Sequence, residues 1–195
     1  MQVRIPIEFS VANPQRVRNA RFIASPNHNE RPAGTAIDLL VIHSISLPPG
    51  RFGGPWIADL FLNRLDPAAD PYFAEVHALR VSAHFLVRRR GGLVQFVPVD
   101  RRAWHAGRSS FAGRAECNDY SIGVELEGDD RHGFTASQYR RLASLTAALQ
   151  KRFPGIGPER IVGHEHIAPG RKTDPGPAFD WPQFRALVRA AGGRA

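Results

Sequence analysis

Residues able to bind a metal or to move protons gather at three places in this sequence, each within or just after a short apolar run. His43 ends the apolar run 37–43, and Glu125 lies in the run 120–126. The segment 163–176 adds two histidines, a lysine, an arginine and an aspartate. Imidazole and carboxylate groups suit Zn²⁺, and a catalytic zinc usually has three protein ligands and a water. The residue types therefore permit a zinc hydrolase.

The spacing of these residues does not by itself require a metal site. The chain contains neither a His-Glu-x-x-His sequence nor a Cys-x-x-Cys pair, which are familiar zinc-binding patterns. In the alternative interpretation, His43 is a hydrogen-bonded core histidine, and Lys172 pairs with Asp174 on a solvated loop. The local pattern leaves both interpretations open.

Short apolar strands must position these residues. Gly91-Gly92 lies between two of them and predicts a β-hairpin, because glycine readily adopts the positive φ angles of tight turns. The predicted strands are residues 37–43, 82–87, 93–97, 120–126 and 161–164.

Helices are predicted from capping residues and apolar spacing. Thr135 and Gln138 have the spacing of a capping box, and apolar residues then recur every three or four positions until Pro154. Asp180 caps a final helix, and a short helix begins near Trp56. Because strands alternate with helices, we expect an α/β fold, and the hairpin makes its central β-sheet mixed.

Length and composition limit the class of protein. A chain of 195 residues with 43% hydrophobic residues can bury a core as a single domain without disulfides. No apolar run reaches the roughly 18 residues of a membrane span, and the N-terminus lacks a signal-peptide pattern. The single cysteine, Cys117, has no partner for an internal disulfide and is expected to be a small apolar filler. We therefore expect a cytoplasmic protein that does not bind membranes.

The net charge of +8 favours an anionic partner. Apart from Lys151 and Lys172 the cations are arginines, and they are scattered rather than clustered with stacking aromatics. This distribution argues against nucleic-acid binding, and it leaves open whether the anionic partner is a membrane surface or a substrate that carries carboxylates. The first 36 residues lack sustained periodicity, so we expect an N-terminal extension, 1–36, packed on a domain formed by residues 37–190.

Six motifs are widely separated along residues 25–190. They are Val-Ile-His-Ser-Ile-Ser-Leu-Pro-Pro-Gly (41–50), Phe-Gly-Gly-Pro-Trp (52–56), Arg-Val-Ser-Ala-His (80–84), Ala-Trp-His-Ala-Gly (103–107), Cys-Asn-Asp-Tyr-Ser-Ile-Gly-Val-Glu-Leu-Glu-Gly (117–128) and Arg-Lys-Thr-Asp-Pro-Gly-Pro (171–177). Together they resemble the motifs of the zinc N-acetylmuramoyl-L-alanine amidases, and their order and joint presence are far more specific than any one motif. The resemblance implies an amidase type 2, peptidoglycan-recognition-like fold.

The resemblance also implies catalytic roles. His43, His164 and Asp174 would be the zinc ligands, with Glu125 as the general base and Lys172 as the cation beside the developing oxyanion. Two neutral imidazoles and one carboxylate leave a zinc site with net positive charge, which polarises an amide carbonyl and acidifies water. A carboxylate within hydrogen-bond reach of that water can take its proton and pass it to the leaving amine.

Two positions inside the motifs have neighbours of the same chemistry. Glu125 and Glu127 lie two apart on a strand and share a face; the resemblance selects Glu125, and Glu127 is left as a structural carboxylate or as a partner of the site. The resemblance likewise selects His164, which follows Gly163, rather than His166.

Two further histidines stay open at this stage. We interpret His84 as a buried, hydrogen-bonded histidine, as a hydrogen-bond partner of a metal ligand, or as a substrate contact. His105 lies in a glycine-flanked loop, where ordinary packing and substrate contact are both compatible with the sequence. The proline- and glycine-rich loop 44–56 would either cover the site or only turn the chain.

Substrate contacts are implied by the resemblance as well. Arg80 and Arg171 would either meet stem-peptide carboxylates or be ordinary solvated arginines, and Trp104 would either form a wall for the sugar ring or only pack in its loop. This chain departs from the pattern at Glu116, where a basic residue is expected, and at position 44, where close relatives have an asparagine. The full set of implied substrate contacts is Ser44, Arg80, Trp104, Leu126, Ala168 and Arg171.

The resemblance implies zinc-dependent hydrolysis of the amide between 1,6-anhydro-N-acetylmuramic acid and L-alanine in soluble muropeptides. Such an enzyme would recycle peptidoglycan in the cytoplasm, and we expect it to act as a monomer. Two alternatives share the same motifs: an amidase of phage type that acts on the intact wall, and a recognition module that binds peptidoglycan without cutting it. A recognition module typically lacks metal ligands, whereas the implied ligand set here is complete.

Overall fold

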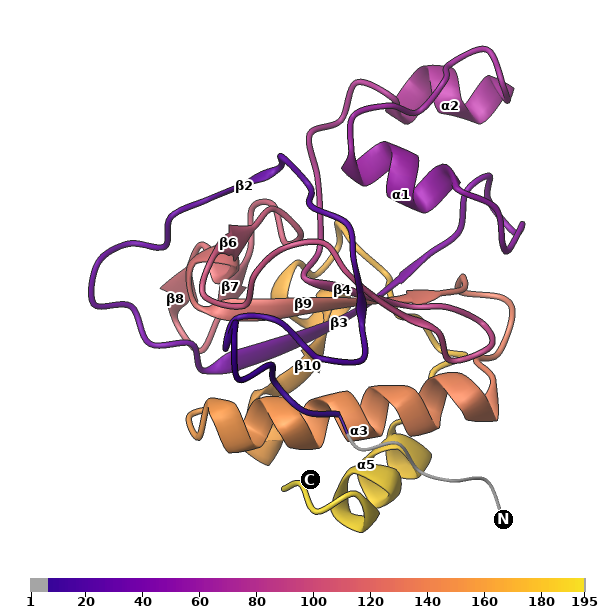
Figure 1. Ribbon diagram of the computed structural model, residues 1–195. Coiled ribbons are helices and arrows are strands. Elements are labelled where there is room, and N and C mark those ends of the chain that lie inside the picture. The colour runs from indigo at the N-terminus through magenta and orange to yellow at the C-terminus, as the bar shows by residue number, and fades with distance from the viewer. Residues whose placement is uncertain (1–6, 195) are drawn as a thin grey trace.

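The computed structural model describes residues 7–194, and a six-stranded mixed sheet is at its centre (Figure 1). The strand order is β1, β5, β4, β9, β3, β10. The β4–β5 hairpin is antiparallel, and the other neighbouring strands are parallel. The strands are β1 (Arg21–Phe22), β3 (Leu39–Ile45), β4 (Phe85–Val87), β5 (Leu93–Gln95), β9 (Ser121–Glu127) and β10 (Ile161–Gly163).

Two small antiparallel sheets lie beside the central one. They are formed by β2 (His28–Asn29) with β6 (Arg102–Ala103), and by β7 (Ser110–Phe111) with β8 (Arg114–Ala115).

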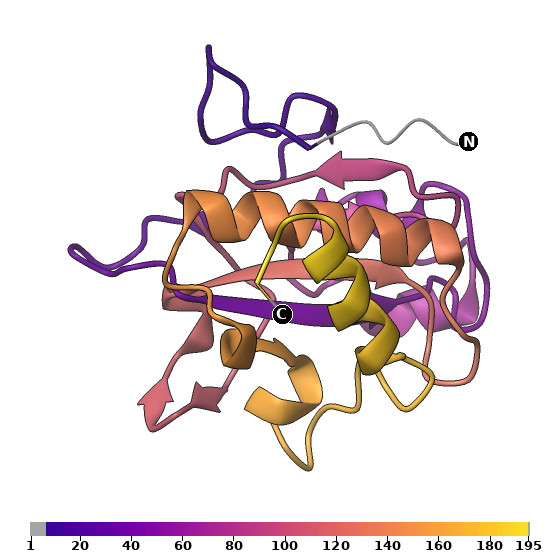
Figure 2. The same cartoon turned by 90° about the horizontal axis from the view of Figure 1, so that it is seen from below.

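Helices lie on both sides of the central sheet. In Figures 1 and 2, α3 and α5 cover one side of the sheet, with α3 running along the strands, whereas α1 and α2 lie on the other side. Because both sides carry helices, the predicted α/β class with a mixed sheet is confirmed. The helices are α1 (Trp56–Phe61), α2 (Pro71–Val76), α3 (Ala136–Arg152), α4 (His164–Ile167) and α5 (Trp181–Ala190), with 3₁₀ turns at Cys117–Asp119 and Pro158–Arg160.

The alternation of side chains along β3 and β9 decides which residues face the helices. Leu40 and Ile42 of β3 and Val124 of β9 belong to the main core cluster, which also contains the apolar stripe of α3. Successive side chains of a strand point to opposite faces of the sheet. His43 and Glu125 therefore lie on the face away from α3.

The local signals located the longer elements closely. Helix α3 begins with the predicted capping box: Thr135 Oγ1 accepts a hydrogen bond from Gln138 N, and Gln138 Oε1 accepts one from Thr135 N. The last helix begins after Asp180, whose carboxylate accepts from Gln183 N. The hairpin is present with shorter strands than expected.

Two predictions about the elements were incomplete or wrong. The strand expected over 161–164 stops at Gly163, and His164 is instead the first residue of α4. Helix α2 was not predicted, although Asp70 caps it and Pro71 occupies its first turn. Its six residues are too few to show a clear apolar period.

The segment expected as an N-terminal extension contributes to the central sheet. Strand β1 pairs in parallel with β5 at one edge. The first six residues of the predicted extension, 1–6, lie outside the described part of the chain. Within the described part, no helix combines the length and apolar character needed to cross a bilayer.

Candidate metal centre and active site

Three side chains from distant parts of the sequence meet beside the ends of β3 and β10. His43 Nδ1 lies 3.0 Å from His164 Nδ1 and 3.0 Å from Asp174 Oδ2. His164 Nδ1 lies 3.1 Å from the same carboxylate oxygen. The three candidate ligand atoms all lie within 4.8 Å of one another. Two imidazole nitrogens and one carboxylate oxygen are thus concentrated at one point, which is a donor set that suits zinc.

Strand register explains why these residues meet. Strands β3 and β10 run parallel with Ile42 beside Gly163, so the next residue of each chain segment, His43 or His164, emerges at the same end of the sheet. Asp174 reaches this point because its carbonyl accepts a hydrogen bond from Glu165 N at 3.0 Å. A Cβ at Gly163 would lie 2.7 Å from the Pro175 ring, so glycine allows the two segments to approach.

His43, His164 and Asp174 form a triad, and their environment sets the protonation of His43 and Asp174. Burial lowers the pKa of His43 to about 4, although the neighbouring Asp174 works in the opposite direction. Burial raises the pKa of Asp174, but the adjacent imidazoles of His164 and His43 outweigh it and hold that pKa far below its usual range. At neutral pH His43 is neutral and Asp174 is ionised, which are the forms that bind a metal.

Glu125 lies beside His43 in the register of β9 and β3 and is 8% exposed. Among the described residues, its buried Oε2 has no hydrogen-bond partner. Burial raises the pKa of Glu125 well above its usual value; the charge of Asp174 adds to this effect, and Lys172 opposes it. Buried polar atoms usually have a hydrogen-bond partner, so the unpartnered Oε2 of Glu125 needs an explanation. An oxygen left free to accept a proton from water in the site is such an explanation.

Two connected cavities meet at this cluster. The first, of about 280 Å³, is lined by the triad, Glu125 and Lys172 together with apolar side chains of α1 and α2. The second, of about 640 Å³, is rich in charged side chains, including Asp129, Asp130 and Arg171. Ser44, Tyr72, Lys172 and Asp174 are among the residues that line both. Asp174 of the triad is therefore accessible from both cavities, whereas His43 and His164 line the smaller one.

Some of the predicted substrate contacts lie at these cavities. Ser44 lines both, as does the predicted catalytic residue Lys172, and Arg171 lines the charged one. Arg171 Nη2 also donates to the carbonyls of Ala106 and Arg108 at 2.7 Å each, which joins the two loops. Ala168 is 5% exposed, and its carbonyl accepts from the backbone N–H groups of Arg171 and Lys172, so it shapes the loop that carries them.

Three other predicted contacts, like Ala168, lie outside the linings of these cavities. Arg80 is exposed and donates to the carbonyl of Ala78 at 3.0 Å. Trp104 Nε1 donates to Asn29 Oδ1 at 2.8 Å. Leu126 is fully buried in the main core, on the face of β9 opposite Glu125. The structure does not bring these side chains to the triad.

The structure separates the paired candidates by their surroundings. Glu127 is 2% exposed and accepts hydrogen bonds from Gly53 N at 2.6 Å, Arg88 Nη1 at 3.1 Å and Arg89 N at 3.1 Å. It therefore anchors the loop before α1. His166 Nδ1 accepts from Gly163 N at 2.9 Å, outside the triad.

The open histidines also differ from each other. His84 is fully buried; its Nδ1 accepts from Gly123 N at 3.0 Å and its Nε2 lies 3.0 Å from the carbonyl of Arg101. His105 instead touches the triad, because its Nδ1 lies 2.9 Å from His43 Nε2. The sequence did not separate these roles. The glycine at position 123, inside a strand, was one sequence signal that another group packs closely there. In the structure a side chain at this position would collide with the His105 ring.

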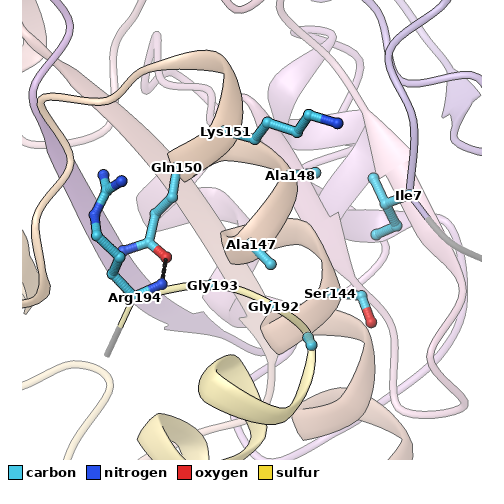
Figure 3. A pocket seen from close by; sticks show the side chains of 10 residues that line it. Ile7, Ser144, Ala147, Ala148, Gln150, Lys151, Gly192, Gly193 and Arg194 are labelled. Atoms are coloured by element: carbon cyan, nitrogen blue, oxygen red, sulfur yellow. Dashed lines mark hydrogen bonds between the residues drawn. The ribbon is translucent and has the colours of Figure 1, made fainter.

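A third pocket, of about 470 Å³, lies away from the triad, between α3 and the C-terminal turn. Figure 3 shows Gln150 there, with its side-chain oxygen accepting from Arg194 N at 2.6 Å. Small side chains and backbone, such as Ala147 and Gly193, form much of its wall. Histidine, cysteine and carboxylate side chains are absent from its lining, so it offers no comparable chemistry.

Known proteins resemble this chain over most of its length. The family described as N-acetylmuramoyl-L-alanine amidase matches residues 33–177. The 1,6-anhydro-N-acetylmuramyl-L-alanine amidase AmpD of Escherichia coli is 57% identical over 169 residues, which cover 87% of this chain and 92% of that protein. AmpD of Citrobacter freundii is 58% identical over 169 residues, covering 87% of this chain and 90% of that protein.

Solved structures agree with this relationship. A crystal structure of a selenomethionine derivative of AmpD matches with a TM-score of 0.87 at 56% identity, over 89% of this chain and 97% of that chain. The Escherichia coli amidase AmiD, solved with anhydro-N-acetylmuramic acid-L-Ala-D-gamma-Glu-L-Lys, matches with a TM-score of 0.59 at 31% identity, over 85% of this chain and 62% of that chain. The fold implied by the motifs is therefore confirmed, and the chain belongs to the N-acetylmuramoyl-L-alanine amidase family.

Proposed function

We propose that this chain hydrolyses the amide bond between 1,6-anhydro-N-acetylmuramic acid and L-alanine in muropeptides. The observation that carries the proposal is the convergence of His43, His164 and Asp174 beside the unpartnered carboxylate oxygen of Glu125. The substrate named for AmpD, its relative at 57% identity, supports this choice of bond. The proposed setting is the cytoplasm, where a monomeric enzyme would act on small peptidoglycan fragments during recycling.

We propose zinc as the metal of this site. Its three donors are two imidazole nitrogens and one carboxylate oxygen, with an adjoining cavity for substrate and water. This arrangement matches the three-ligand plan of catalytic zinc. Zinc held there would polarise the amide carbonyl and lower the pKa of water.

The chain's own residues supply the remaining chemistry. Glu125 takes a proton from the attacking water and passes it to the amine that leaves with L-alanine. Lys172, at the rim shared by both cavities, stabilises the negative charge that develops on the former carbonyl oxygen. The two imidazoles beside Asp174 hold its pKa far below the usual range, so its carboxylate is ionised and can hold a cation.

Replacing Glu125 tests the proposal. Glu125→Gln preserves side-chain shape but cannot accept the proton, so we expect the hydrolysis rate on purified anhydromuropeptide to fall at least about 100-fold. Zinc content and the thermal unfolding midpoint should stay close to those of the unsubstituted protein. Glu159→Gln, an exposed glutamate in a 3₁₀ turn, is the matched control. Full activity of Glu125→Gln would remove Glu125 as the base.

Substrate comparison separates the proposal from its alternatives. An anhydromuropeptide amidase should turn over the soluble fragment much faster than insoluble cell-wall sacculi, whereas a wall-acting amidase should show the reverse preference. A recognition module would bind the fragment and release no stem peptide even when supplied with zinc.

A further inference from the structure

We infer that His105 is a positioning residue that fixes the ring tautomer of His43, so that the unprotonated Nδ1 of His43 faces His164 and Asp174. The inference rests on the proposed metal site. It concerns how that site is prepared before any metal or substrate binds.

The first link of this arrangement is a backbone carbonyl. Ser121 Oγ lies 2.5 Å from the carbonyl oxygen of Cys117 and 3.1 Å from His105 Nε2. A carbonyl oxygen only accepts, so the Ser121 hydroxyl proton is directed to Cys117. Ser121 Oγ must then accept from His105 Nε2–H.

The position of the His105 ring proton then determines the position of the His43 ring proton. His105 is buried, and its hydrogen-bond partners within residues 7–194 include no carboxylate; as a neutral imidazole it has one ring proton. Because that proton is on Nε2, His105 Nδ1 accepts, and His43 Nε2, 2.9 Å away, must donate. Neutral His43 is then left without a proton on Nδ1.

These hydrogen bonds oppose the effect of Asp174 on the tautomer of His43. The carboxylate oxygen lies 3.0 Å from His43 Nδ1 and would by itself favour a proton on that nitrogen. His164 must also leave its Nδ1 unprotonated in order to bind a metal. Its Nε2 lies 3.1 Å from the carbonyl of Ala106, which directly accepts a hydrogen bond from a proton on Nε2. The loop 104–106 thus supplies a hydrogen-bond partner to both imidazoles.

The surrounding packing is built for the His105 ring. A Cβ at Gly123 would lie within 2.6 Å of several atoms of that ring, so β9 can accept it only with glycine there. Asn118 Oδ1 accepts from the backbone N–H groups of His105 and Ala106 at 3.0 and 2.8 Å, which fixes the loop. Backbone and glycine placement therefore define where the ring lies.

Nitrogen NMR of the metal-free, unsubstituted protein at pH 8 tests the tautomer directly. We expect His43 to carry its proton on Nε2 and to show an unprotonated Nδ1, with His105 also protonated at Nε2. A proton on His43 Nδ1 would overturn the inference. The measurement uses neither metal nor substrate, so it can fail while the proposed amidase activity stands, and it can succeed where that activity is absent.

Two substitutions at His105 separate hydrogen bonding from packing. His105→Leu fills the space but offers no acceptor, so zinc affinity, measured by competition with a chelator, should fall about 10- to 100-fold. His105→Asn offers a side-chain oxygen near the place of Nδ1 and should recover most of that affinity. In the spectra, His105→Leu should also shift the His43 proton toward Nδ1.

The matched control is His84→Leu. His84 is another buried histidine, and its ring centroid is 5.8 Å from that of His105, but its hydrogen bonds reach no member of the triad. We expect its zinc affinity to be unchanged even if stability falls. Equal losses of affinity in His105→Asn and His105→Leu, or no loss in His105→Leu, would contradict the inference.

Discussion

Glu125 and Glu127 have the same side-chain chemistry and lie two positions apart on β9, yet their hydrogen-bond partners differ. Glu127 accepts three hydrogen bonds from the neighbouring loop and hairpin. Glu125 Oε2 is buried and has no partner among the described residues. A carboxylate whose lone pairs are occupied is held in place, whereas an unoccupied one can accept a proton. At the scale of the residue, hydrogen-bond partners therefore separate a structural acid from a candidate base.

The prediction at the scale of the residue concerns the charge of Lys172. Lys172→Met retains most of the stem but removes the charge that would stabilise the oxyanion, so we expect kcat to fall about 100-fold with zinc still bound. Steady-state kinetics on anhydromuropeptide measures this effect. Lys151→Met, on the outer side of α3, replaces the other lysine in the chain and should leave kcat unchanged. A similar kcat in both variants would contradict the role of Lys172.

At the scale of the element, the loop between β3 and α1 is fixed by its contact with β9. Gly53 N donates to Glu127 Oε1, and Arg88 at the end of β4 donates both to that oxygen and to the carbonyl of Gly54 at 2.9 Å. Part of this loop also lines the charged cavity through Pro49 and Gly50. The predicted cover is thus joined to the sheet by one buried carboxylate.

Removing that carboxylate should free the loop. Glu127→Ala leaves Arg88 and two backbone N–H groups without their acceptor, so we expect a loss of about 3 kcal/mol in the free energy of unfolding. Urea denaturation measures the loss, and limited proteolysis should show faster cleavage near Gly53. The control, Glu75→Ala, removes an exposed glutamate of α2 and should change stability by less than about 0.5 kcal/mol. An unchanged urea midpoint for Glu127→Ala would refute this anchoring role.

At the scale of the whole molecule, burial of neutral histidines links folding to pH. Burial lowers the pKa of His43 to about 4 and those of His84 and His105 well below their usual value, and nearby positive charge adds to the effect for His84 and His105. In the unfolded chain these groups titrate near 6.5. Between these pKa values each of the three histidines binds more protons in the unfolded state than in the folded state, so together they lower stability as pH falls. The raised pKa of Glu125 acts in the opposite direction, but it is one group against three.

We expect the metal-free protein to lose stability steadily from about pH 6.5 to pH 4, by roughly 1 kcal/mol per pH unit for each such histidine. Urea midpoints across this range measure the slope. His84→Leu should reduce the slope, because it removes one of the titrating groups. A flat profile between pH 6.5 and pH 4 would contradict the prediction.

Zinc should add stability in the same molecule, because it binds the folded triad and not a preformed site in the unfolded chain. We expect the thermal midpoint to rise with zinc and to return on chelation. Asp174→Ala removes one donor of the triad and should abolish most of this rise, whereas the exposed Asp66→Ala should not. A zinc-induced rise of equal size in Asp174→Ala would contradict the assigned ligand set.

Local sequence determined those features that depend on near neighbours. The Thr135 and Gln138 pair begins α3, Asp180 begins α5, and apolar runs form β3 and β9, because caps and side-chain periods act within a few residues. The amidase motifs also brought together His43, His164 and Asp174 as a predicted set, and these side chains do meet in the structure.

Tertiary structure alone decided which groups surround each candidate. Glu127 is held by Gly53, 74 positions away, and His43 meets His105, 62 positions away. Trp104 turns to Asn29 rather than to the cavity. A strand's period sets the face on which a side chain lies, but the donors that reach it come from segments brought there by sheet order and loop packing. Burial and hydrogen-bond partners, and with them the pKa values, therefore follow from the fold.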